Sequence, residues 1–106
     1  LKFEYRKNHF VRSDEVLFSS TWMCTSSSPE LVKKTIDETF ARRKSTQPLE
    51  YPSCGSVFKN PHPKRAWEVI EKIGLRGHRI GNAAFSEKHP NFIVNLGGAK
   101  ANDVWE

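Results

Sequence analysis

The segment 47–61 contains the residue types that a site for an anionic ligand needs. Pro48 and Pro52 stiffen its backbone, and Gly55 permits a sharp bend. The four small residues at 53–56 would let a ligand approach the main chain closely. Lys59 and Asn60 then supply a cation and an amide. This combination predicts a site that binds an anion by charge and by hydrogen bonds, which an ordinary surface linker does not need.

Five blocks of sequence, in order along the chain, resemble one enzyme family. They are FEYR at 3–6, QPLEYPSC at 47–54, GSVFKNP at 55–61, GHRIG at 77–81 and SEKHPNFIVN at 86–95. Together they resemble the shorter-chain class of the MurB family, the flavoprotein UDP-N-acetylenolpyruvoylglucosamine reductases of peptidoglycan synthesis. The resemblance implies an oxidoreductase that uses FAD and NADPH. Its reaction would reduce UDP-N-acetylglucosamine enolpyruvate to UDP-N-acetylmuramate.

The resemblance also implies roles for individual residues. Ser56 stands at the position of the family's proton donor, and Arg6 at that of an arginine that reaches the active site. The residues implied to lie near FAD are Tyr5, Arg43 and His89, and those implied to contact the substrate are Gly55, Lys59, Asn60 and Lys88. For Lys88 and His89, which are neighbours, the resemblance leaves two alternatives open: either residue could contact the UDP part of the substrate or the flavin. Two departures from the family pattern are Asn8, where a serine is common, and Asn82, where a second glycine is usual.

The reaction that the resemblance implies needs a cation and an acid. Hydride addition to the terminal carbon of the enolpyruvyl group pushes negative charge onto the substrate carboxylate, and the fork of a guanidinium such as that of Arg6 suits a carboxylate. Ser56 would protonate the adjacent carbon from within about 3 Å. Because a serine hydroxyl is a weak acid in water, this role depends on a charged acceptor and a nearby positive field. Lys59 would provide part of that field.

The residues by themselves also permit plainer interpretations. Ser56 and Asn60 are common in turns, and basic residues such as those at 42–44 often do no more than favour the negative pole of a helix dipole. His89, which precedes a proline, is equally typical of an exposed loop. His9, His62 and His78 show no metal-ligand spacing, and the two cysteines lie too far apart for a zinc half-site, so no metal site is expected.

Hydrophobic periodicity and capping signals indicate the elements that must position these residues. Ser27 and Glu30 suggest a capping box in front of a helix that begins at Pro29. Gly74 suits the end of a second helix. The expected elements are a strand at 15–23, helices at 29–44 and 66–73, strands at 78–86 and 91–95, and a helix that starts near Asp103. The apolar stripe of the first helix consists of Leu31, Val32, Thr35, Ile36, Thr39 and Phe40.

This order of elements predicts an α+β fold. With the resemblance it implies that residues 1–48 form the end of a flavin-binding domain and that residues 49–106 form a small, incomplete substrate-binding domain. The chain is therefore expected to be a piece of a longer protein. The resemblance places a glycine-rich flavin-binding part before it and a catalytic glutamate beyond Glu106. We expect this piece alone neither to hold FAD tightly nor to turn over.

Composition restricts the partners less sharply. A net charge of +5 and a pI near 9.4 favour anionic ligands in general. No apolar run approaches the ~20 residues of a membrane span, so no membrane partner is expected, and the resemblance implies the cytoplasm of a bacterium. A non-catalytic module that binds a UDP-sugar or a similar anion is the alternative. A nucleic-acid-binding domain is disfavoured, because the aromatic residues follow apolar stripes instead of clustering with the lysines.

Overall fold

The computed structural model describes residues 2–106 and has an α+β fold, as the sequence predicts. Its elements are β1 (Phe3–Glu4), β2 (Lys7–Asn8), α1 (Pro29–Thr46), β3 (Ser53–Ser56), α2 (Ala66–Lys72), β4 (Arg79–Ile80), β5 (Ala83–Phe85), β6 (Phe92–Asn95) and α3 (Ala101–Trp105). No helix within these residues is long and apolar enough to cross a membrane. The same residues contain no cluster of histidine, cysteine and acidic side chains that could hold a metal ion.

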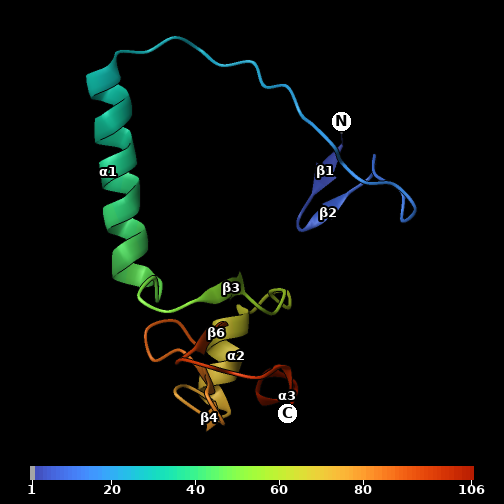
Figure 1. Ribbon diagram of the computed structural model, residues 1–106, viewed down its shortest axis with the longest axis vertical. Coiled ribbons are helices and arrows are strands. Elements are labelled where there is room, and N and C mark those ends of the chain that lie inside the picture. Colours follow the sequence, from blue (N-terminus) through green and yellow to red (C-terminus); the bar gives the residue numbers. More distant parts are fainter. Residues whose placement is uncertain (1) are drawn as a thin grey trace.

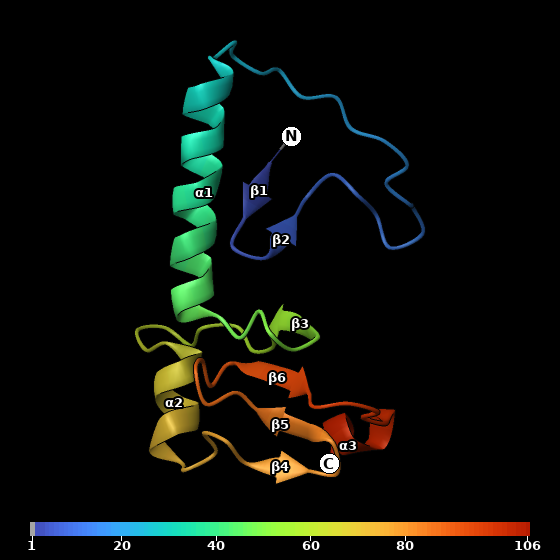
Figure 2. The same cartoon turned by 60° about the vertical axis from the view of Figure 1, so that its left-hand side comes forward.

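A small antiparallel sheet organises the second half of the chain. Its strand order is β3-β6-β5-β4, and α2 and α3 lie on opposite sides of the strands in Figure 2. Alternate residues of β6 are buried, as expected for a strand with one face against a core. The buried apolar residues are Ala66, Ile70, Ala83, Ala84, Phe92 and Val94. The predicted helix at 66–73 and strand at 91–95 are confirmed to within one residue at each end.

The predicted strand at 78–86 is wrong in its centre, because a turn splits it into β4 and β5. Ile80 pairs with Ala83, which leaves a two-residue loop of Gly81 and Asn82. Gly81 has a φ of +53°, in the left-handed region that glycine tolerates best. The carboxylate of Asp103 accepts hydrogen bonds from the backbone N–H of Asn82 (3.1 Å) and of Lys100 (3.0 Å). Asp103 therefore ties the start of α3 to the β4–β5 turn.

We expect Gly81→Ala to destabilise the fold more than Gly74→Ala does. Both glycines have left-handed backbones, with φ of +53° and +77°, and alanine there costs about 1–2 kcal/mol. A Cβ at Gly74 meets nothing within 4 Å, whereas one at Gly81 would lie 2.5 Å from the carboxyl carbon of Asp103. Denaturant unfolding of both variants measures the difference. Equal losses of unfolding free energy would mean that the close approach to Asp103 contributes nothing.

The carboxylate of Asp103 should make stability depend on pH. Hydrogen bonds from the backbone N–H groups of Lys100 and Asn82 lower the pKa of Asp103 in the folded state. The contribution to stability is therefore present above the unfolded pKa of about 3.9, and it is lost as pH falls through the folded pKa. We expect Asp103→Asn to remove this part of the acid sensitivity. The test is to measure the unfolding free energies of wild type and Asp103→Asn at about pH 6 and about pH 3. If both proteins lose the same amount of stability between these pH values, the expectation is contradicted.

Helix α1 stands apart from the sheet (Figure 1) and is two residues longer than predicted. Its N-cap is Ser28, and not the predicted Ser27, because Pro29 occupies the first turn and the Ser28 hydroxyl accepts from the backbone N–H of Leu31 at 3.2 Å. None of its described residues is buried. The predicted apolar stripe is thus present in sequence but is exposed, with Leu31, Val32, Ile36 and Phe40 between 46% and 60% accessible.

The predicted strand at 15–23 is wrong. Residues 11–28 form an irregular stretch that arches from the β1–β2 hairpin to the far end of α1 (Figure 1). Val16, Phe18 and Trp22 are 91%, 99% and 78% exposed. A segment with alternating apolar residues forms a strand only where it can pair with a neighbouring strand and pack against an apolar surface. Within residues 2–106 this stretch pairs with neither sheet.

Candidate functional site

A bulge in β3 sets the orientation of Ser56. Ser53 pairs with Val94 and Ser56 with Phe92, so that three steps along β3 match two steps along β6. The extra residue lies between Ser53 and Ser56, in the part of the strand where Gly55 has a φ of +85°, which few other residues adopt. A bulge of this kind bends a strand and turns a side chain away from the regular alternation. Ser56 is consequently half-buried at the end of the strand, beside two cavities.

The turn of the N-terminal hairpin contacts this strand end. Tyr5 and Arg6 form the turn between β1 and β2, and Arg6 has a left-handed backbone, with a φ of +53°. The Nη2 of Arg6 donates a hydrogen bond to the carbonyl oxygen of Ser56 at 3.0 Å, across 50 residues of sequence. The hydroxyl of Tyr5 accepts from the backbone N–H of Asn60 at 3.4 Å. Two contacts therefore hold the hairpin turn against the segment 56–60.

The two cavities share Arg6 and Ser56 in their walls. The larger, of about 510 Å³, is also lined by Arg43 and Gly55. The smaller, of about 140 Å³, is lined by Tyr5, Arg6, Ser56, Asn60, Arg65, Trp67, His89 and Asn91. Each cavity is lined by two arginines, and neither is lined by an aspartate or a glutamate. The electrostatic character of both cavities therefore suits an anion.

The hydrogen bonds of Asn60 and His89 determine what these two side chains can offer a ligand. The Oδ1 of Asn60 accepts from the backbone N–H of Ala66 at 3.0 Å, at the start of α2, which leaves its amide N–H₂ as the available donor. The Nδ1 of His89 accepts from the backbone N–H of Asn91 at 3.3 Å. A neutral His89 therefore carries its proton on Nε2 and presents an N–H donor.

The structure brings together seven of the nine predicted site residues around these two cavities. They are Tyr5, Arg6, Arg43, Gly55, Ser56, Asn60 and His89. Lys59 lines neither cavity. Lys88 lies at a separate hollow of about 620 Å³, where its ammonium pairs with the carboxylate of Glu50 at 3.3 Å and donates to the carbonyl of Lys44 at 3.4 Å. The backbone N–H of Glu50, and then this ammonium, lower the pKa of Glu50.

Three residues that were not predicted from the sequence also line the smaller cavity: Asn91, Arg65 and Trp67. Asn91 lies inside one of the family-like blocks, so its position was visible although its role was not. Arg65 and Trp67 flank the first residue of α2, and the helix start that the sequence predicts at Ala66 could have pointed to them.

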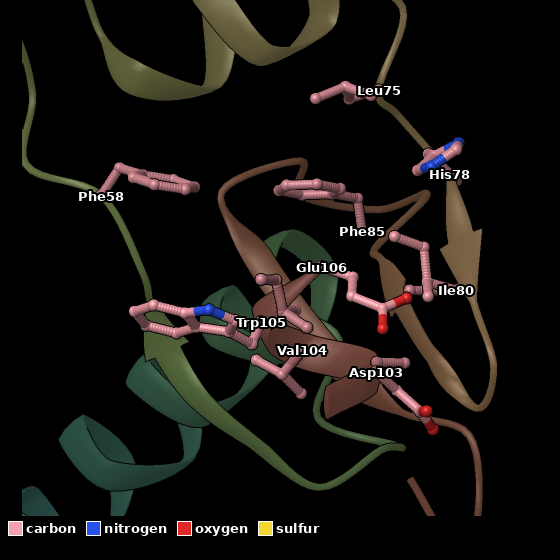
Figure 3. Close-up of a pocket in the computed structure, with 12 residues that line it drawn as sticks. Phe58, Leu75, His78, Ile80, Phe85, Asp103, Val104, Trp105 and Glu106 are labelled. Atoms are coloured by element: carbon pink, nitrogen blue, oxygen red, sulfur yellow. The ribbon is translucent and has the colours of Figure 1, made fainter. Parts of the chain in front are cut away.

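A different hollow, of about 310 Å³, lies between α3 and the β4–β5 hairpin. In Figure 3 the rings of Phe58, Phe85 and Trp105 surround it, with Asp103 and Glu106 at one side. None of the nine predicted site residues lines it. It is therefore a mainly apolar groove distinct from the two cavities beside Ser56.

Comparison with known proteins identifies the family. The family described as UDP-N-acetylenolpyruvoylglucosamine reductase, C-terminal domain, matches residues 47–106. The reductase of Halalkalibacterium halodurans is 42% identical over 104 residues, which is 98% of this chain and 35% of that protein. A Listeria monocytogenes reductase is 44% identical over 103 residues, with coverages of 97% and 35%. This chain spans about a third of the length of these relatives.

A solved structure agrees with these sequence matches. The crystal structure of UDP-N-acetylenolpyruvylglucosamine reductase (MurB) from Thermus caldophilus is similar, with a TM-score of 0.62 and 38% sequence identity. The similarity covers 76% of this chain and 30% of that one. Since the family match spans more than half of the chain and the fold agrees, this chain belongs to the UDP-N-acetylenolpyruvoylglucosamine reductase (MurB) family, of which it represents a C-terminal part.

Proposed function

We propose that this chain is the substrate-facing part of an FAD-dependent reductase that converts UDP-N-acetylglucosamine enolpyruvate to UDP-N-acetylmuramate with NADPH. The observation that carries the proposal is the contact between Arg6 and Ser56, which lie 50 residues apart in sequence. Both line the same two cavities, whose walls contain no carboxylate. We expect the reaction to serve peptidoglycan synthesis in the bacterial cytoplasm.

The chemistry of the cavity walls fits the two ligands. The guanidinium of Arg43 suits a phosphate of FAD, and the ring of Tyr5 and the Nε2–H of His89 suit its flavin. When bound, FAD supplies the hydride that the terminal carbon of the enolpyruvyl group receives. The amide N–H₂ of Asn60 and the backbone at Gly55 are the groups that would hold the UDP-sugar. The proposal also includes the substrate role predicted for Lys59 and Lys88, although Lys59 lines neither cavity and the ammonium of Lys88 pairs with Glu50 at a separate hollow.

The residues of this chain would then act on the substrate directly. Arg6 has five N–H donors, of which one contacts the Ser56 carbonyl, so others remain for the substrate carboxylate. The negative charge that hydride addition places on that carboxylate is stabilised by the guanidinium. The hydroxyl of Ser56 gives its proton to the adjacent carbon and regains one from solvent. One hydride and one proton thus add across the double bond, which leaves the lactyl ether.

The exposed apolar surfaces support the proposal that residues 1–48 belong to a larger flavin-binding domain. The apolar stripe of α1 and the side chains of Val16 and Phe18 lack a core within residues 2–106, and burying such surface typically contributes about 25 cal/mol per Å². Residues 49–106 would form the substrate-binding domain. We expect the chain of 106 residues, by itself, neither to retain FAD nor to turn over.

Flavin reoxidation tests the proposed reaction. The complete polypeptide that carries this chain would be purified, its flavin reduced with NADPH, and the reduced protein mixed with UDP-N-acetylglucosamine enolpyruvate. We expect the flavin to be reoxidised rapidly, as measured by its absorbance, and UDP-N-acetylmuramate to be formed. A protein that lacks flavin but still binds the nucleotide sugar would instead favour a non-catalytic anion-binding module. A protein that does neither would overturn both interpretations.

A further inference from the structure

We propose that Asn91 is a positioning residue that fixes the main chain on which the Ser56 hydroxyl is carried. This inference rests on the proposed function of Ser56 as proton donor. Asn91 is only 4% exposed and lies in the loop before β6, in the wall of the smaller cavity. A buried side-chain amide needs hydrogen-bond partners for both its N–H donor and its oxygen acceptor. The partners of the Asn91 amide therefore indicate its role.

The side chain of Asn91 makes both hydrogen bonds that a neighbouring strand would make. Its Oδ1 accepts from the backbone N–H of Phe58 at 2.9 Å, and its Nδ2 donates to the carbonyl of Phe58 at 2.9 Å. In addition, its own carbonyl accepts from the backbone N–H of Val57 at 2.9 Å. Asn91 therefore clamps the two residues that directly follow Ser56.

This clamp lies where the sheet stops providing support. The regular pairing of β3 ends at Ser56, after a bulge that already breaks the register. Without Asn91, the left-handed Gly55 on one side and an unpaired segment on the other would let the strand end rotate. With it, Ser56 is held between a bulge and a doubly bonded residue. A reacting hydroxyl needs such restraint, because an error of about 1 Å can cost about a hundredfold in rate.

The clamp also connects Ser56 with the loop that carries His89. The backbone N–H of Asn91 donates to the Nδ1 of His89 at 3.3 Å, and the ring of His89 meets that of Phe92 edge-on, with centroids 4.8 Å apart. The loop is braced further by the hydroxyl of Ser86, which accepts from the backbone N–H of His89 at 3.3 Å. Asn91 thus joins two walls of the smaller cavity.

The decisive substitution is Asn91→Asp, because an ionised carboxylate accepts but does not donate. It keeps the bond from the Phe58 N–H but turns an oxygen against the Phe58 carbonyl. The chain offers a matched control in Asn95→Asp, on β6. The Oδ1 of Asn95 accepts from the backbone N–H groups of Gly97 (2.9 Å) and Ala99 (3.0 Å), and a carboxylate can accept both bonds as well. The two substitutions are chemically identical but differ in the donor that they remove.

The experiment compares the two half-reactions in the complete flavoprotein. We expect Asn91→Asp to slow reoxidation by UDP-N-acetylglucosamine enolpyruvate about tenfold, while reduction of the flavin by NADPH keeps its wild-type rate. Asn95→Asp should alter neither. In a double variant with Ser56→Ala, the Asn91→Asp substitution should cause no further loss, because both act on one proton transfer. Asn91→Gln, which introduces no charge but displaces the amide by one methylene, should also slow reoxidation.

Three outcomes would overturn this role for Asn91. They are wild-type reoxidation by both Asn91 variants, losses that multiply with that of Ser56→Ala, or an equal fall in both half-reactions and in flavin content, which would indicate a purely structural residue. If wild-type protein is not reoxidised by this substrate, the proposed function fails instead. Amide hydrogen exchange at Phe58 then still tests the clamp: it should be faster in Asn91→Gln, which displaces the oxygen that accepts from the Phe58 N–H, than in wild type, and equal rates would exclude the clamp.

Discussion

Ser56→Ala should slow reoxidation of the reduced flavin by UDP-N-acetylglucosamine enolpyruvate at least a hundredfold, because a positioned general acid typically contributes about 10²–10⁴ in rate. The hydroxyl stands at the bulge of β3, on the border of both cavities. Alanine removes the proton that the second carbon needs, and leaves the backbone contact with Arg6 possible, since that contact uses the Ser56 carbonyl. Stopped-flow absorbance of the flavin in the complete polypeptide measures the rate.

Two comparisons show whether the loss concerns proton donation. Reduction of the flavin by NADPH involves no enolpyruvyl carbon, so it should proceed at the wild-type rate in Ser56→Ala. Ser45→Ala removes a hydroxyl that bonds only within α1, to the carbonyl of Arg42 at 2.8 Å, and should leave both half-reactions unchanged. If Ser56→Ala is reoxidised as fast as wild type, the family assignment stands but the proton comes from another group.

The positions of several candidate site residues could be predicted because short motifs determine them locally. The GSVFKNP block contains its own glycine for the bulge and its own asparagine for the start of α2, so Gly55, Ser56 and Asn60 reach the cavity walls from neighbouring positions. Arg6 and Tyr5 were predicted from resemblance alone. No local rule brings a hairpin turn to a strand end 50 residues later.

The partners of Lys88 and Asn91 could not be predicted from sequence, since both lie far away along the chain. Lys88 pairs with a carboxylate 38 residues away, and Asn91 bonds a main chain 33 residues away. A lysine looks the same in sequence whether its charge faces a ligand or a glutamate. An asparagine before a strand resembles a turn residue until its partner is known.

The fold shows the same division between local and long-range information. The start of α1 and the C-terminal glycine of α2 were predicted to within a residue, because capping depends on neighbours in sequence. The strand predicted at 15–23 was wrong. Alternation of apolar and polar residues shows which face of a strand could be buried, but it does not show whether another element is present to cover that face. The β4–β5 turn was missed although Gly81-Asn82 is a typical two-residue hairpin loop, because the strands on either side have only two and three residues.

Arg6→Gly should reduce substrate-driven reoxidation by about 10²–10³-fold, the usual effect of removing a donor that stabilises transition-state charge. Glycine is chosen because Arg6 has a φ of +53°, where a side chain costs about 1–2 kcal/mol. Relief of this penalty offsets much of the lost hydrogen bond to Ser56, which is worth about 1.5–3 kcal/mol because its donor is charged. We therefore expect the unfolding free energy of Arg6→Gly to change little, although its rate of reoxidation falls strongly. Arg12→Gly, which removes an exposed pair with Asp14, is the control for a lost surface arginine.

Arg6→Lys separates charge from geometry at the same position. A lysine ammonium retains the positive charge but cannot contact the Ser56 carbonyl and a carboxylate with one rigid fork. We expect its rate to lie between those of wild type and Arg6→Gly, and its Michaelis constant for the nucleotide sugar to rise. A lysine variant as fast as wild type would mean that a point charge suffices and that the 3.0 Å contact with Ser56 is incidental. A variant as slow as Arg6→Gly would mean that the guanidinium acts mainly by joining the hairpin turn, Ser56 and the substrate carboxylate in one arrangement.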